Sequence, residues 1–88
     1  MQSREQIVDF CETAEIEILL LPHEFDEVIV GLSVKFNEYS VVYDSNKCIE
    51  CLMKIDNMTF EDATEYFEFN ILGAYVGPNT PTYLVDIM

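Results

Sequence analysis

The sequence MTFEDATEYFEFNILGAYVG, residues 58–77, contains the most clearly delimited helix of the chain. Thr59, followed three residues later by Asp62, is an acidic variant of the capping box, which satisfies free N–H groups where a helix begins. Gly77 and Pro78 end the pattern, because glycine accepts a left-handed closing geometry and proline cannot continue a helix. Between these limits, apolar residues at three- and four-residue steps share one face: Phe60, Ala63, Phe67, Ile71 and Ala74. We therefore expect a helix over 60–75, and we expect the first four of these side chains to hold it to a sheet.

Another face of this predicted helix is acidic. It carries Glu61, Glu65 and Glu68, and like charges at this spacing destabilise a helix by a few tenths of a kcal/mol per pair. Such a face is either solvated or meets cations when a partner binds. Tyr66 and Phe69 flank the same carboxylates, and aromatic side chains beside acids are typical of a binding hot spot for a basic partner. The alternative for Phe69 is that it widens the apolar face.

Length and charge limit the class of protein. Eighty-eight residues allow one domain, 1–88, with one modest core. The net charge of −13 repels nucleic acid and anionic lipid and attracts basic surfaces. A surface of this charge is also found where it only keeps a protein soluble. Composition does not distinguish this role from the binding of a basic partner. No apolar run approaches the roughly 20 residues of a membrane span, and no positively charged leader stands before an apolar block, so we expect a cytoplasmic location.

The remaining segments predict an α+β fold. Ser3 and Gln6 open a helix over about 4–13, whereas 14–21 fits both helix and strand and stays open. Residues 28–36 and 39–43 alternate and are rich in β-branched side chains, so they predict an antiparallel pair of strands, with a helix as the rival over 28–36. Gly31 marks either a bulge or a close approach of the backbone.

The second half completes this fold. A helix over about 46–55, capped by Asp44 or Ser45, pairs with 60–75 as an αα-hairpin packed against the sheet. A last strand over 82–87 is expected to join the sheet and bury three side chains: Tyr83, Val85 and Ile87. The expected sheet is short and mainly antiparallel.

No catalytic, cofactor-binding or metal site is predicted. Cys48 and Cys51 form a C-x-x-C on a helix, but no tight turn or βαβ unit leads into it, so inward packing is the favoured interpretation. Adding Cys11 and His23 would supply four ligands, yet their spacing matches no zinc pattern. We therefore expect no enzyme activity and no cofactor, and a metal or redox protein is the third alternative.

The segment from about Phe25 to Leu84 resembles a family of short proteins of unassigned function that is common in tailed-phage genomes. The pattern that carries it is YDxxKCIExLM, DxMTxEDAxEYFEFN and GAYVGxNTP, which here spans Tyr43–Pro81. The resemblance brings no activity or ligand. It implies a phage or prophage setting and expression in a bacterial host.

Together these observations predict a non-enzymatic, acidic phage-type accessory protein that binds a basic host protein and neither nucleic acid nor membrane. A DNA-mimic inhibitor of a nucleic-acid-directed defence enzyme, such as an anti-CRISPR protein, is the subtype we expect. The second alternative is a self-associating structural or regulatory module, a homo-oligomer with its acids outward. The predicted partner-binding residues are Glu61, Glu65, Tyr66 and Glu68, with Glu12 and Glu15 as a second patch.

Overall fold

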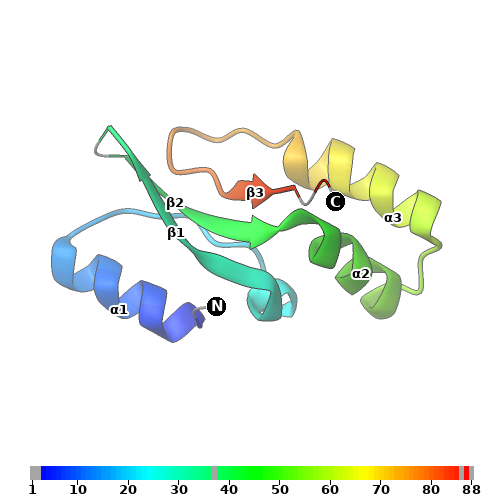
Figure 1. The fold of residues 1–88 in the computed structure, drawn as a ribbon, viewed down its shortest axis with the longest axis horizontal. Coiled ribbons are helices and arrows are strands. Elements are labelled where there is room, and N and C mark those ends of the chain that lie inside the picture. The colour runs from blue at the N-terminus through cyan, green and yellow to red at the C-terminus, as the bar shows by residue number, and fades with distance from the viewer. Residues whose placement is uncertain (1–2, 37, 86, 88) are drawn as a thin grey trace.

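The computed structural model describes residues 3–36, 38–85 and 87. In chain order the elements are α1 (Arg4–Ala14), the 3₁₀ helix η1 (His23–Val28), β1 (Ile29–Lys35), β2 (Glu38–Asp44), α2 (Ser45–Ile55), α3 (Phe60–Tyr66), the π-helix η2 (Phe67–Leu72) and β3 (Thr82–Leu84). The predicted α+β class, with a helix before the sheet and a helical pair after its hairpin, is confirmed. Figure 1 shows α1 beside the β1–β2 hairpin and the α2–α3 pair at the other end of the sheet.

The sheet is mixed and has the order β1-β2-β3. Strands β1 and β2 are antiparallel as expected, and their register shifts between Ile29 and Gly31, which agrees with the bulge alternative for Gly31. Strand β3 pairs with β2 in parallel, from Val42↔Thr82 to Asp44↔Leu84. Hydroxyls also connect the three strands, because Ser33 Oγ lies 2.8 Å from Ser40 Oγ, which lies 2.6 Å from Thr82 Oγ1.

Each α-helix begins at a side-chain cap that the sequence predicts. Ser3 and Gln6 form a reciprocal capping box at α1, and the Asp44 side chain accepts the N–H of Lys47 at α2. At α3 the Thr59 side chain accepts the N–H of Asp62, which is one half of the capping box predicted there. These caps explain why the helices begin where they do.

The segment between α1 and η1, whose structure the sequence left open, is neither helix nor strand. Glu15 ends α1 in the left-handed conformation, with φ of 57°, and residues 16–22 then run irregularly. Both backbone groups of Leu21 are bound: its N–H donates to the Tyr43 hydroxyl at 2.9 Å, and its carbonyl accepts from Arg4 Nη2 at 2.6 Å. The same Arg4 pairs with Asp26 at 2.9 Å. Long-range side chains therefore replace local hydrogen bonds in this segment.

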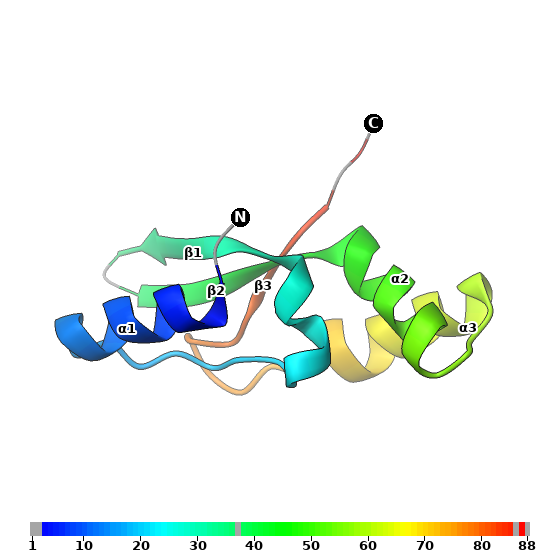
Figure 2. The ribbon, with the colours of Figure 1, turned by 90° about the horizontal axis from the view of Figure 1, so that it is seen from below.

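The core lies between α1, the sheet and the inner faces of α2 and α3. Its buried side chains are Ile7, Cys11, Phe25, Val28, Ile29, Val41, Tyr43, Cys48, Leu52, Ala63 and Phe67. Figure 2 shows the elements that contribute them, seen from below. Two of these side chains, Ala63 and Phe67, belong to the predicted inner face of the helix that follows residue 59.

Other members of that face are placed differently. Phe60 is 63% exposed, because α3 begins at the far end of the molecule, away from the sheet. Ile71 is partly buried, and Ala74 lies beyond the helix, which ends at Leu72. The prediction that Phe60 holds the helix to the sheet is wrong, and the predicted helix 60–75 is three residues too long at its C-terminal end.

The last strand is shorter than expected. It ends at Leu84, because its partner β2 ends at Asp44, where α2 begins. Val85 is 63% exposed and Ile87 is 91% exposed, so the expected burial of these side chains is wrong, whereas Tyr83 packs against the core. Residue 86 lies outside the described residues.

In the part of the chain that the structure describes, no helix has the length and apolar character needed to cross a bilayer.

Candidate functional site

The candidate site is built on α3 and the π-helix that continues it. The Gly73 N–H donates to the Glu68 carbonyl at 3.1 Å, a bond across five residues that closes the wide turn. A Cβ at Gly73 would lie 3.1 Å from that carbonyl oxygen, so glycine suits the close approach. Single π turns inside helices occur frequently at functional sites.

Phe67 fixes the orientation of this helical segment. Its ring meets the Tyr83 ring edge-on, with 5.2 Å between ring centroids and an angle of 88° between the planes. Tyr83 in turn stacks against Tyr43 at 6.2 Å. Burial, with Cys48 and Tyr43 nearby, raises the pKa of Tyr83 to about 12. Because this side of the helix is held in the core, the side that bears the carboxylates faces outward.

A hollow of about 500 Å³ lies on this outward side, and we call it the acidic groove. It is lined by Met58, Asp62, Glu65, Tyr66, Phe69 and Asn70. Carboxylates, aromatic rings and a thioether meet there, and Phe69 is 75% exposed. A lysine or arginine side chain suits such a groove, because its charge pairs with the acids while its stem and cation contact the rings and the thioether.

The structure brings together some of the predicted partner-binding residues and separates others. Glu65 and Tyr66 line the acidic groove. Glu61 is exposed outside it, and Glu68 lines a different hollow, together with Phe69 and Leu72.

The predicted second patch is not continuous with the acidic groove. Glu12 is exposed on α1 and borders a mainly aliphatic hollow, and Glu15 is the residue that ends α1. Phe69, which is exposed, lines the surface of the acidic groove and does not widen the core face. Three further residues of the groove were not identified by periodicity: Met58, Asp62 and Asn70.

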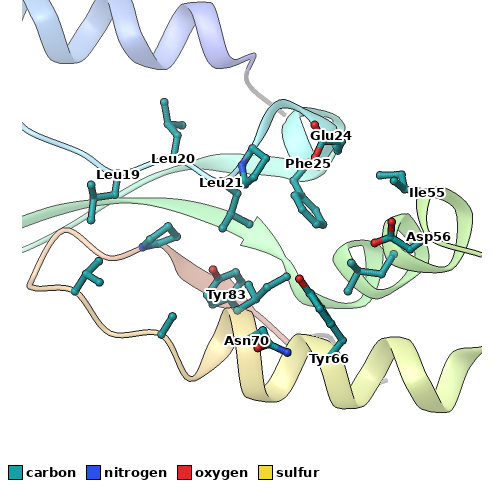
Figure 3. A pocket seen from close by; sticks show the side chains of 16 residues that line it. Leu19, Leu20, Leu21, Glu24, Phe25, Ile55, Asp56, Tyr66, Asn70 and Tyr83 are labelled. Carbon is teal, nitrogen blue, oxygen red and sulfur yellow. The ribbon is translucent and has the colours of Figure 1, made fainter. Parts of the chain in front are cut away.

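A second hollow, which we call the apolar cleft, has a volume of about 490 Å³ and was not predicted. Figure 3 shows it between the segment before η1, the end of α2 and the α3–η2 helix. Leu21, Phe25, Leu52, Ile71 and Tyr83 supply apolar walls, and Tyr66 and Asn70 line both this cleft and the acidic groove. No local sequence signal identifies the cleft, because its walls come from segments far apart in the chain.

Of the described residues, those that line the two hollows include acidic side chains and no basic one. The charged residues that line the apolar cleft are Glu24 and Asp56, and those that line the acidic groove are Asp62 and Glu65. Among residues 3–36, 38–85 and 87, Arg4 forms an ion pair with Asp26 and His23 contacts the same Asp26, so none of these four carboxylates is paired with a basic side chain there. Both hollows therefore present negative charge to a ligand.

The cysteines are not placed as a reactive pair. Cys48 is fully buried, and this burial raises the pKa of its thiol to about 12, whereas a redox thiol needs a lowered pKa. Burial also raises the pKa of Cys51, whose Sγ donates to the Glu24 carbonyl at 3.8 Å. Within the described ranges, no three His, Cys, Asp or Glu side chains gather as metal ligands.

No family model matches this chain, and no curated protein and no solved structure shows significant similarity to it.

Proposed function

We propose that this protein is a non-enzymatic binding domain whose acidic groove takes a lysine or arginine side chain from a basic protein surface. The observation that carries the proposal is the joint lining of one hollow by Asp62, Glu65, Tyr66 and Phe69. Carboxylates on their own are commonly solvated, whereas exposed aromatic rings beside unneutralised carboxylates form a surface with affinity for a cation.

The rest of the acidic surface has a different role in this proposal. Glu61 and Glu68 lie on the same helical segment but outside the groove, and they contribute to the field that attracts a basic partner. Long-range attraction changes the association rate and its salt dependence, whereas a group in direct contact changes the dissociation rate.

The partner we propose is a bacterial host protein whose basic surface handles nucleic acid. A net charge of −13 and the resemblance to a phage family support this choice. By occupying a surface that phosphate groups otherwise fill, the domain inhibits its partner without any chemical step. The location that follows from this proposal is the bacterial cytoplasm.

A titration of the ¹⁵N-labelled protein with the peptide Ac-Arg-Ala-Ala-Arg-NH2 tests the groove, with NMR shifts as the readout. We expect shifts concentrated at residues 58–70, and about a fivefold loss of affinity in the variant Asp62→Asn/Glu65→Gln, which corresponds to about 1 kcal/mol. The matched control is Glu61→Gln/Glu68→Gln, which changes the same helical segment by the same charge. Equal losses in both variants, or shifts spread over every acidic face, contradict the groove.

Capture from bacterial lysate then identifies the partner. A partner that the wild type and the Glu61→Gln/Glu68→Gln control retain, and that the groove variant releases, fits the proposal. Added duplex DNA must displace this partner if it binds through a nucleic-acid surface. Retention in the presence of duplex DNA contradicts the DNA-mimic part alone.

Self-association is the second candidate function, and an exposed apolar surface favours it. Phe69, Leu72 and Val85 line a common hollow beside β3 and are each more than half exposed. Surfaces of this kind mark interfaces in soluble proteins. Sedimentation separates the two candidates, because an apolar dimer resists salt, whereas binding through the acidic groove weakens as salt rises.

A further inference from the structure

The apolar cleft has the features of a preformed binding site. Its upper wall is fixed, because Leu21 is held at its N–H by the Tyr43 hydroxyl and at its carbonyl by Arg4. Its lower wall is the α3–η2 segment, which Phe67 anchors to Tyr83. A site with fixed walls loses little conformational freedom when it is filled, and so more of the interaction energy appears as affinity.

The polar groups of the apolar cleft lie at its rim. Figure 3 shows Glu24 and Asp56 at the edge and Tyr66 reaching from the helix toward Phe25. Among the side-chain hydrogen bonds of the described residues, none uses the Tyr66 hydroxyl or the Asn70 amide, so both groups can bind a ligand's backbone. An apolar group inside and a cation at the rim complement this arrangement.

The apolar cleft adjoins the acidic groove, and this favours a peptide over a small molecule as the ligand of the cleft. Tyr66 and Asn70 line both hollows, which therefore meet along the helix. An extended chain advances about 3.3 Å per residue, so side chains two or three positions apart in one segment reach neighbouring hollows. A single small amine fills one hollow and leaves the other empty.

We infer that the apolar cleft takes a leucine-sized side chain from the same partner segment whose basic residue occupies the acidic groove. This inference rests on the proposed function and specifies the partner: a segment with an apolar anchor within a few residues of a lysine or arginine. Tyr66 packs between the two side chains and presents its ring to both.

The test compares Ac-Arg-Ala-Ala-Arg-NH2 with Ac-Arg-Leu-Ala-Arg-NH2 in the same NMR titration. Burial of the leucine side chain is expected to tighten binding about tenfold in the wild type. Ala74→Trp, which places a ring at an exposed position that lines the cleft, removes this gain and leaves the binding of the alanine peptide intact. Ala14→Trp, at an exposed position at the end of α1, is the matched control and keeps the gain.

The possible outcomes separate the inference from the proposed function. If the alanine peptide binds through the acidic groove and leucine adds nothing, or if Ala74→Trp leaves the gain intact, the inference about the cleft is wrong and the proposed function stands. If neutralising Asp62 and Glu65 does not weaken the alanine peptide, the proposed function is wrong. If leucinamide alone binds as tightly as the leucine peptide, the cleft is a small-amine site and the peptide inference is overturned.

Discussion

Two acidic helical segments, α1 and α3, differ in what surrounds their carboxylates. On α1 the exposed acids and the exposed aromatic ring are separate: Glu12 borders an aliphatic hollow, and Phe10 lines another hollow that contains no acid. On α3 the acids Asp62 and Glu65 share one hollow with Tyr66 and Phe69. Charge on a helix face therefore does not define a site, whereas charge and aromatic surface in one concavity give a cation two kinds of contact.

Both segments bury apolar side chains in the core, but only α1 adds a polar attachment. Ile7 and Cys11 of α1 are buried, as is Phe67, which directly follows α3 and packs against Tyr83. In addition, Arg4 at the start of α1 makes an ion pair with Asp26 and a hydrogen bond to Leu21. Removing the buried ring of Phe67 and removing the polar contacts of Arg4 should therefore lower the free energy of unfolding by different amounts.

The largest effect is expected for Phe67→Ala. Removing a buried ring leaves a cavity beside Tyr83 and lowers the free energy of unfolding by about 3–5 kcal/mol. Urea unfolding followed by circular dichroism measures it. Phe69→Ala is the control, because this ring is exposed and its removal should change stability by less than about 0.5 kcal/mol. Equal losses would mean that the exposed ring, and with it the acidic groove, is part of the core.

A smaller loss is expected for Arg4→Ala. Its guanidinium donates to Asp26 and to the Leu21 carbonyl, and hydrogen bonds from a charged group contribute about 1.5–3 kcal/mol. We expect a loss of about 2 kcal/mol in urea unfolding. Lys35→Ala, at an exposed position, should be nearly neutral. Since Leu21 lines the apolar cleft, Arg4→Ala should also reduce the leucine gain defined above, and an unchanged gain would show that this wall does not need Arg4.

Alkaline pH should destabilise the core beside α3. The pKa of Cys48 is raised from 9.0 to about 12 in the folded chain, so above pH 9 the unfolded chain loses this proton while the folded chain keeps it. The unfolded state is then favoured, and stability falls by at most about 1.4 kcal/mol per pH unit for this thiol. The loss continues until pH rises through the folded-state pKa. Cys48→Ala should flatten the fall between pH 9 and 12, and an unchanged slope would assign the effect to other groups such as Tyr83.

Local chemistry explains which parts of this fold the sequence predicts. The caps at Ser3, Asp44 and Thr59 depend on residues within a few positions and are found as expected, as is the bulge that was one of two alternatives for Gly31. The parallel pairing of β3 and its end at Leu84 depend on where β2 stops, which the local pattern of residues 82–87 does not contain.

The site was predictable only in part, for the same reason. Helical spacing brought Glu65, Tyr66 and Phe69 to one side, but it could not show that Glu68 lies in another hollow, because the other walls of that hollow come from distant parts of the chain, among them Ser45 and Tyr83. The apolar cleft depends on Leu21, whose position is set by Tyr43 and Arg4, each at least 17 positions away in the chain. Periodicity left that segment open because its structure is determined by tertiary contacts.

The smallest effects are expected from neutralising one carboxylate on each of the two helical segments. Glu65 lies between Glu61 and Glu68, and Asp9 lies between Glu5 and Glu12, at the same four- and three-residue spacings. Glu65→Gln and Asp9→Asn should therefore each relieve like-charge repulsion and stabilise the fold by about 0.2–0.5 kcal/mol, measured in urea at low salt. This gain should shrink as salt screens the charges.

Peptide affinity should distinguish Glu65→Gln from Asp9→Asn, although the two variants should have the same effect on stability. Only Glu65→Gln should weaken Ac-Arg-Ala-Ala-Arg-NH2, because Glu65 lines a hollow that contains aromatic rings. If Asp9→Asn weakens the peptide equally, net charge alone governs binding, and the acidic groove has no special role. If Glu65→Gln stabilises the fold and lowers the affinity for the peptide, then repulsion between carboxylates on α3 lowers the stability of the fold at a position that peptide binding requires.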